Sequence, residues 1–166
     1  MRREFTLAGA LALTLVLAAA AVAGEVPDFS GKWVMDRGRS EGVPPDMEQT
    51  MTVAQSGDRI SVETRVVSDQ GDTTLSATYN LNGKEEEYKA ARMGLEGKGK
   101  RTAKWAAEAG RFEVSEEETF EGPNGPVSLK FSRRWAAGAD GKTLTIELDV
   151  QGPNGPQHSK RTFVKQ

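Results

Sequence analysis

Residues 60–66, Ile-Ser-Val-Glu-Thr-Arg-Val, decide the fold class, because apolar and polar side chains alternate along them. A period of two places Ile60, Val62 and Val66 on one face of a β-strand and Glu63 on the other. Similar alternation recurs in five further stretches: residues 47–53, 75–79, 112–120, 127–135 and 144–150. Turn-forming Gly, Asn, Asp and Pro residues separate these stretches. The pattern predicts an all-β protein, an antiparallel meander of about eight to ten strands.

Two glycine-rich segments, residues 37–45 and 90–100, follow the alternation poorly and are predicted to be loops. Outside residues 1–23, only 24 of 143 residues are Leu, Ile, Val or Phe, and the formal net charge is −3. This aliphatic content is low, but disorder by composition also requires a large net charge. A closed up-and-down β-barrel accounts for the scarcity, because only the inner face of each strand is buried. We therefore predict one barrel domain over residues 24–166.

Residues 1–23 have the pattern of a secretory signal peptide. A short basic start precedes an apolar run over residues 7–22, and residues 21–23, Ala-Val-Ala, have the spacing of a cleavage site. A membrane anchor is the alternative, but the apolar run is short for a membrane span. The arginine pair at the start fits both an ordinary export signal and a twin-arginine signal. We expect export to the periplasm or the extracellular medium, with no stable membrane anchor after cleavage.

The composition disfavours several kinds of site. The chain has no cysteine and therefore no disulfide, thiolate nucleophile or thiolate metal site. Its single histidine, His158, lies near a turn with outward parity, which favours a solvated role over haem ligation or general base catalysis. One histidine without cysteine also disfavours a structural zinc site. We expect no metal and no cofactor.

Charged clusters do not predict catalysis or nucleic-acid binding. Residues 116–118 are three consecutive glutamates, of which only the outer two share a strand face, and such runs are typical of solvated surfaces. The basic residues between Lys98 and Lys104, close to Trp105, are interpreted as a solvated strand face, because the chain is net negative. No serine-nucleophile or phosphate-loop motif is present. We expect no enzymatic activity and no nucleic-acid partner.

The sequence Gly-Pro-Asn-Gly-Pro occurs twice, at residues 122–126 and 152–156, each time between two strands. A two-residue Asn-Gly turn would need an N–H from the second proline, which has none. A four-residue loop that pairs Gly122 with Val127 avoids this difficulty. That loop predicts the register of both hairpins.

The predicted register places charges on the apolar face. It makes Glu116 the direct cross-strand neighbour of Arg133, which predicts an interior ion pair. Glu118 shares this face, and in the last strand Arg161 shares the face of Phe163. A carboxylate on this face must be paired or hydrated. Two interpretations stay open: polar anchors for a ligand in a cavity, or a hydrated rim at the barrel mouth.

These features resemble the lipocalin-type proteins, a superfamily that also includes avidins and fatty-acid-binding proteins. Residues 29–33, Phe-Ser-Gly-Lys-Trp, contain their Gly-x-Trp motif, and Arg161 occupies the place of their final-strand basic residue. The resemblance implies that Arg161 packs across Trp33 and closes one end of the barrel, a cation–π contact contributing roughly 1–2 kcal/mol. Residues 140–145, Asp-Gly-Lys-Thr-Leu-Thr, are similar to a hairpin of small exported bacterial lipocalin-like proteins. No ligand motif of the relatives is matched.

The leading functional hypothesis is an exported, non-catalytic barrel that binds a small apolar or amphipathic molecule. Trp33 and Arg161 would close one end, and Glu118 or Arg133 would orient the ligand. The other cavity candidates are aromatic: Tyr79, Trp105, Phe112, Phe131 and Trp135. The alternative is a structural or protein-interaction module with a filled core, whose loops at residues 37–45 and 90–100 contact an unidentified protein. An enzyme ranks last.

Overall fold

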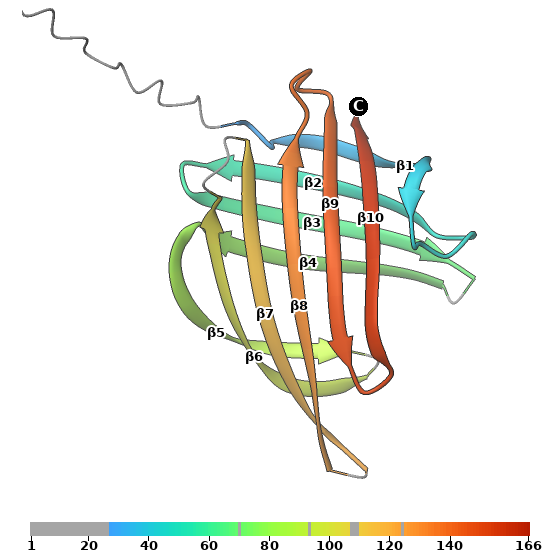
Figure 1. Ribbon diagram of the computed structural model, residues 1–166, viewed down its shortest axis with the longest axis vertical. Helices are drawn as coiled ribbons and strands as arrows, with labels where there is room; N and C mark the ends of the chain where they lie inside the picture. Colours follow the sequence, from blue (N-terminus) through green and yellow to red (C-terminus); the bar gives the residue numbers. More distant parts are fainter. Residues whose placement is uncertain (1–26, 70, 93, 107–109, 124) are drawn as a thin grey trace, which may run out of the picture.

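A computed structural model describes residues 27–69, 71–92, 94–106, 110–123 and 125–166. Residues 1–23, for which the sequence predicts a signal peptide, lie outside the described part. The described residues form ten β-strands and their connections (Figure 1). The strands are β1 Gly31–Glu41, β2 Glu48–Ser56, β3 Arg59–Ser68, β4 Gly71–Asn80, β5 Asn82–Arg92, β6 Leu95–Trp105, β7 Arg111–Gly122, β8 Gly125–Ala137, β9 Thr143–Gly152 and β10 Gly155–Lys165.

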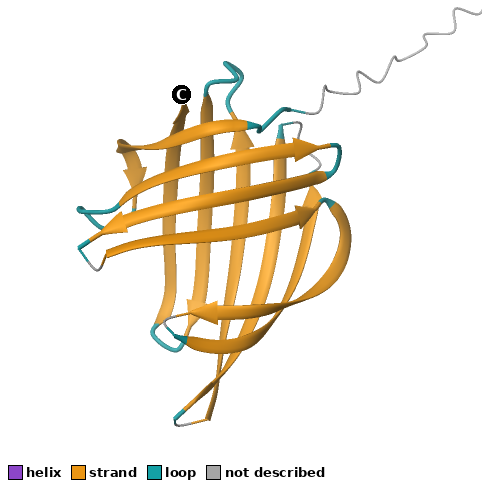
Figure 2. Cartoon of the chain, turned by 180° about the vertical axis from the view of Figure 1, so that it is seen from behind, coloured by secondary structure: helices purple, strands orange, loops and turns teal. Residues whose placement is uncertain are grey.

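All ten strands belong to one antiparallel sheet, in the order β4-β3-β2-β1-β10-β9-β8-β7-β6-β5. The sheet curls so that β1–β4 cross β7–β10 as a second layer (Figures 1 and 2). Pairing of β1 with β10 joins the first and last of the described strands, and β4 and β5 are the two edges of the sheet. The barrel is therefore nearly closed, and the predicted all-β up-and-down barrel of eight to ten strands is confirmed. In the described part of the chain, no helix has the length and apolar character needed to cross a membrane.

Side chains bridge the seam between the two edges. Arg101 of β6 donates from Nη1 to the carbonyl of Thr78 in β4, at 2.7 Å. Nearby, Asn80 donates from Nδ2 to Glu86 Oε1 of β5, at 2.6 Å. These contacts cluster where the chain passes from β4 into β5, so the seam is closest at that end and widens away from it (Figure 2).

Aromatic side chains fill one end of the barrel, which we call the closed end. Phe112 meets Phe29 edge-to-face and stacks on Trp135, with ring centroids 5.0 Å apart in both pairs. Trp33 is 1% exposed and donates from Nε1 to the Phe29 carbonyl at 2.9 Å. Full burial of such side chains contributes about 1.5–3 kcal/mol each. The starts of the odd-numbered strands and the ends of the even-numbered strands meet at this end, and most of the buried large apolar residues lie at these positions. They are therefore concentrated at one end of the barrel.

The predicted register of the Gly-Pro-Asn-Gly-Pro hairpins is wrong by two residues. Gly122 pairs with Gly125, and Gly152 pairs with Gly155, so each hairpin has a two-residue connection. Pro126 then lies opposite Glu121. Gly122 and Gly125 are the hydrogen-bonded pair that closes the turn, and the next pair along an antiparallel ladder is not hydrogen-bonded. The proline therefore needs no N–H at this position. A shift of two preserves which face each side chain occupies, so the predicted inner face survives the error.

The segment 90–100 is wrongly predicted to be a loop, because it forms the end of β5 and the start of β6. A Cβ added to Gly99 would lie 2.4 Å from Tyr88 Cζ, and one added to Gly97 would lie 2.6 Å from Phe120 Cδ1. Glycine is required at both positions because rings from the adjacent strands lie across them. Because glycine has no side chain, these two positions do not show the apolar–polar alternation in the sequence.

The other predicted loop, residues 37–45, is also largely strand, because β1 continues to Glu41. The register of β1 against β10 shifts between Asp36 and Glu41. In this irregular stretch Asp36 Oδ2 accepts from Arg39 Nε at 2.7 Å, and Ser40 Oγ accepts from the Thr162 N–H at 3.0 Å. The two segments proposed as contact loops for a protein partner are therefore mostly β-structure.

Candidate functional site: an interior cavity

A cavity of about 400 Å³ lies inside the barrel beyond the closed end. Strands of both layers supply its wall. The apolar part of that wall includes Met51, Val62, Ala77, Phe131, Ile146 and Leu148. Charged side chains from β5, β7, β8 and β10 enter the same space and form three polar centres. A cavity of this size with a few convergent polar groups is typical of a small-molecule site.

The first polar centre is the carboxylate of Glu116, whose side chain is 6% exposed. Glu116 Oε2 accepts from Arg133 Nη1, and Glu116 Oε1 lies 3.3 Å from Arg101 Nε. The sequence predicts the Glu116–Arg133 pair, although Glu116 pairs directly with Phe131 and reaches Arg133 diagonally. Two guanidinium groups share one carboxylate, so this centre carries an excess positive charge.

The second polar centre is Glu118, which is 4% exposed. Its Oε1 accepts from the Tyr88 hydroxyl at 2.8 Å and from Arg92 Nη2 at 3.2 Å, while Oε2 accepts from Arg92 Nε. Tyr88 and Arg92 belong to β5 and reach Glu118 of β7 past the intervening β6, where the Tyr88 ring lies over Gly99. Burial raises the pKa of Tyr88, and the negative charge of Glu116 and the hydrogen bond to Glu118 raise it further.

The third polar centre is Arg161 of β10. Its Nη1 donates to Gln49 Oε1 at 3.0 Å, and its buried Nε has no hydrogen-bond partner among the described residues. The indole Nε1 of Trp135, on the same cavity wall, also has no partner there. Within the described ranges no carboxylate pairs with Arg161. Burial lowers the pKa of this guanidinium, and the positive charge of Arg133 lowers it further.

The charges around the cavity do not balance. Four guanidinium groups and two carboxylates form the three centres, so these described groups carry an excess of two positive charges. Low-dielectric surroundings strengthen the field of such charges. The arrangement favours negative charge inside the cavity and disfavours a cation.

Trp33 and Arg161 do not form the predicted closing pair. The cation over the Trp33 ring is Lys165, whose Nζ lies 5.2 Å from the ring centroid. Trp33 pairs with Lys165 between β1 and β10, whereas Arg161 lies four residues earlier in β10 and points to Gln49. The register of the last strand, which the sequence does not specify, decides which basic residue meets the indole ring.

Five of the seven predicted cavity residues line the cavity: Tyr79, Glu118, Phe131, Arg133 and Trp135. Phe112 belongs instead to the aromatic core of the closed end. Trp105 packs on Phe29 and donates from Nε1 to Asp58 Oδ1 at 2.7 Å. The prediction that these two residues line the cavity is wrong, because both lie at the end where the barrel is filled.

Sequence reasoning misses Gln49, Tyr88, Arg92 and Arg101. Gln49 has the parity of its apolar neighbours in β2, which is the signal that could have identified it. Arg101 shares the inner face of β6 with Gly99 and Ala103, each two residues away. The loop interpretation of residues 90–100 conceals this alternation.

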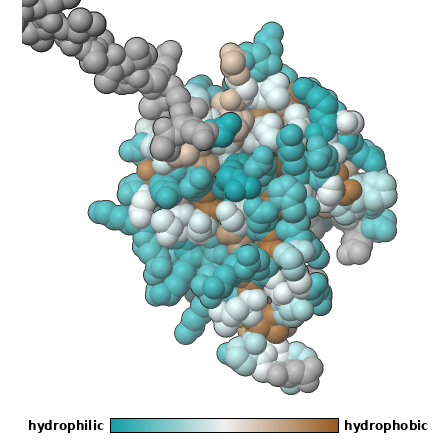
Figure 3. Space-filling model, in the orientation of Figure 1, coloured by the Kyte–Doolittle hydropathy of each residue, from teal (hydrophilic) through white to brown (hydrophobic). Residues whose placement is uncertain are grey.

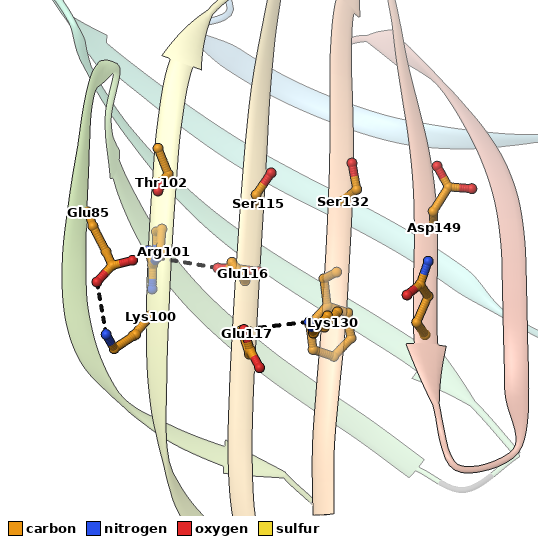
Figure 4. Close-up of a pocket in the computed structure, with 12 residues that line it drawn as sticks. Glu85, Lys100, Arg101, Thr102, Ser115, Glu116, Glu117, Lys130, Ser132 and Asp149 are labelled. Carbon is orange, nitrogen blue, oxygen red and sulfur yellow. Dashed lines mark hydrogen bonds and ion pairs between the residues drawn. The ribbon is translucent and has the colours of Figure 1, made fainter.

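The outer face of the barrel is mostly hydrophilic over β7–β10 (Figure 3). A depression of about 350 Å³ lies across β5–β9, and Figure 4 shows charged side chains on neighbouring strands around it. Lys100 Nζ lies 3.0 Å from Glu85 Oε1, and Lys130 Nζ lies 3.9 Å from Glu117 Oε2. Exposed pairs of this kind contribute about 0–1 kcal/mol. His158 belongs to the same surface, with Nδ1 2.7 Å from Asp149 Oδ1.

In the ranges that the structure describes, no three His, Asp or Glu side chains come together as ligands for a metal ion. The interior carboxylates of Glu116 and Glu118 are each held by arginine, and some exposed ones pair with lysine or arginine on a neighbouring strand.

The fold is similar to solved structures of β-barrel proteins. Secretory abundant heat soluble protein 4 from Ramazzottius varieornatus has a TM-score of 0.51 and 15% identity, covering 86% of this chain and 97% of that chain. Zebrafish ileal bile acid-binding protein, complexed with cholic acid, has a TM-score of 0.49 and 18% identity, with 83% and 98% covered. The fatty-acid-binding protein of Manduca sexta has a TM-score of 0.41 and 13% identity, with 82% and 99% covered.

No protein-family model matches the chain, and no curated protein matches it in sequence. At these identities, the similarity of structure concerns the fold alone. The chain has the lipocalin- or calycin-type fold, a nearly closed antiparallel barrel.

Proposed function

We propose that the protein is a non-catalytic binding protein for one small amphipathic anion. The apolar body of the ligand would occupy the cavity, and its anionic head group would pair with Arg161. The observation that carries the proposal is the guanidinium of Arg161 at the wall of a cavity of about 400 Å³, with no carboxylate partner and an unsatisfied Nε among the described residues.

The energetic reason is the cost of leaving a cation without a counter-charge. Removing a charge from water costs several kcal/mol unless a partner compensates for it. Gln49 supplies one neutral acceptor, so the charge of Arg161 stays uncompensated among the described residues. An anionic head group would supply both the counter-charge and an acceptor for Nε.

Trp135 supports the same position for the head group. Trp135 of β8 and Arg161 of β10 both pair with Ile146 of β9, one from each side. One strand therefore lies between them on the inner face. Their Cα atoms are then separated by about 10 Å, and both side chains extend into the cavity. The indole Nε1 is a second donor without a partner, and an oxyanion would satisfy it.

The test uses three probes with the same alkyl chain: dodecanoate, dodecanol and dodecylammonium. Isothermal titration calorimetry should give the tightest binding for dodecanoate, weaker binding for dodecanol and the weakest for dodecylammonium. Equal affinities for the three probes would contradict a role for Arg161 charge. Absence of binding by all three would contradict the cavity as a site for an amphipathic ligand.

We also propose that the ligand is bound outside the cytoplasm, on the basis of the signal-peptide pattern in residues 1–23. Expression of the full chain in a bacterial host, followed by N-terminal sequencing of the exported material, tests this. Export with a new terminus at Gly24 is expected. Retention of the full-length chain in the cytoplasm would contradict it.

A further inference from the structure

The cavity contains a second polar centre that the anionic head group would not occupy. Glu118, Arg92 and Tyr88 form this centre, which we call the mouth cluster. Arg161 lies in the same cross-strand row as Phe112, through Ile146 and Trp135. Glu118 lies six residues further along β7, a separation of about 20 Å along the strand. The mouth cluster therefore faces the end of the ligand remote from Arg161.

The charge of the mouth cluster differs from that of Arg161. Arg92 donates to Glu118 through Nε and Nη2, so the two charges compensate each other. The guanidinium lies over the Phe131 ring, 4.3 Å from its centroid. Its Nη1 has no partner among the described residues, and the Arg92 side chain is 33% exposed, whereas the Glu118 side chain is buried. The cluster thus offers an N–H donor beside a carboxylate acceptor, without net charge.

Two glycines make this cluster accessible to the cavity. Any side chain at Gly99 would overlap the Tyr88 ring, and Gly97 is filled by the Phe120 ring. Because β6 presents no side chain at Gly99, Tyr88 crosses the strand there, and Tyr88 and Arg92 both hold the Glu118 carboxylate at the cavity wall. The members of the polar centre come from two strands, β5 and β7, which are separated by β6.

We propose that the ligand carries a hydroxyl, or a similar neutral hydrogen-bonding group, at the end of its apolar body remote from the anionic head. This inference rests on the proposed function, because it assumes that the anion pairs with Arg161. A hydroxyl can either donate to the Glu118 carboxylate or accept from Arg92 Nη1, because it is both a donor and an acceptor. A charged group would leave one member of the compensated pair facing a like charge.

The physical contrast with a purely apolar cavity makes the inference testable. In an apolar cavity, a terminal hydroxyl weakens binding because the group loses its hydrogen bonds to water. At the mouth cluster the hydroxyl regains them, and a net hydrogen bond corresponds to about three- to tenfold in affinity. The sign of the effect therefore distinguishes the two cases.

The experiment compares dodecanoate with ω-hydroxydodecanoate by isothermal titration calorimetry. The wild-type protein should bind the hydroxylated probe about three- to tenfold more tightly. Arg92→Gln and Glu118→Gln should each remove that preference, measured as the ratio of the two dissociation constants. Glu117→Gln is the matched control, because Glu117 lies on the outer face of the same strand and pairs with Lys130; it should keep the wild-type ratio.

The outcomes separate this inference from the proposed function. Tight binding of dodecanoate with weaker binding of the hydroxylated probe would overturn the inference and leave the proposed function intact. A preference that persists in both variants would also overturn it, because the hydroxyl would then be recognised elsewhere. Failure of both probes to bind would count against the proposed function itself. Glu118→Gln leaves the partly exposed Arg92 as the charge without a partner, so this variant should fold even if Arg92→Gln, which leaves the buried Glu118 carboxylate without its cation, does not.

Discussion

Arg161 of β10 reaches past β1 and donates to Gln49 of β2, with 3.0 Å between Nη1 and Oε1. The contact joins residues that are 112 positions apart and satisfies one guanidinium nitrogen. It does not neutralise the charge, because the Gln49 amide is neutral. An interior position that holds an uncompensated cation lowers the stability of the protein unless an anion binds there.

The unliganded protein should become more stable when this cation is removed. Replacing a buried, uncompensated charge with a hydrophobic residue of similar size is neutral or stabilising, and we expect Arg161→Met to raise the free energy of unfolding by about 1–2 kcal/mol. Urea denaturation measures this change. The control is Lys160→Met, which removes an outward-facing cation and should change stability by less than about 0.5 kcal/mol. A clear loss of stability in Arg161→Met would mean that the cation is compensated.

The carboxylate of Glu116 should behave oppositely, because it is shared by two guanidinium groups. Removing the negative charge leaves Arg101 and Arg133 close together without a counter-ion. We expect Glu116→Gln to lower the free energy of unfolding by about 3–5 kcal/mol, and Glu117→Gln on the outer face to change it by less than about 0.5 kcal/mol. Equal effects of the two substitutions in urea denaturation would show that the interior pairs are solvated.

Gly99 and Tyr88 should be energetically coupled. A Cβ at Gly99 would lie 2.4 Å from Tyr88 Cζ, so the ring must move if Gly99 becomes alanine. Overpacking of this kind costs about 1–3 kcal/mol, and we expect Gly99→Ala to do so. In a Tyr88→Ala background the same substitution should cost much less. Additive effects in this double-mutant cycle would contradict the claim that Gly99 is required because the Tyr88 ring lies across it.

The tyrosines provide a pH test, because the chain contains only two, Tyr79 and Tyr88. Burial raises the pKa of both phenols above the ordinary value of 10.0. The folded protein therefore keeps its phenolic protons at a pH where the unfolded chain loses them. The contribution of the two tyrosines to stability should be constant below pH 10 and should be lost as the pH rises above it.

A spectrophotometric titration followed together with circular dichroism measures this directly. Phenolate absorbance should appear only as the β-structure is lost. Formation of phenolate near pH 10 in a protein that is still folded would show that the interior is open to water at both rings.

The fold is predictable because alternation in residues 60–66, 112–120 and 144–150 survives in strands that bury one face. Register is harder. The two-residue connections at Gly122–Gly125 and Gly152–Gly155 place the proline at a position that needs no N–H, and a local argument about the turn does not reveal this. An error of two residues keeps the inner face but changes every cross-strand partner.

The candidate site is predictable only in part. Glu118, Arg133 and Trp135 follow from parity, because they alternate with outward residues on long, regular strands. Arg92 and Arg101 do not, because Gly97 and Gly99 remove the apolar half of the pattern in β6. The partner of Trp33 could not be predicted either, since the choice between Arg161 and Lys165 depends on how β10 is aligned with β1.

The central claim is that Arg161 supplies the charge that binds an anionic head group, and one titration tests it most directly. Dodecanoate and dodecanol are titrated calorimetrically into the wild-type protein and into Arg161→Met. We expect the substitution to weaken dodecanoate binding at least about tenfold, the equivalent of 1.4 kcal/mol, and to leave dodecanol binding unchanged or tighter. Equal weakening of both probes would contradict the claim, as would dodecanoate binding that is the same in the two proteins.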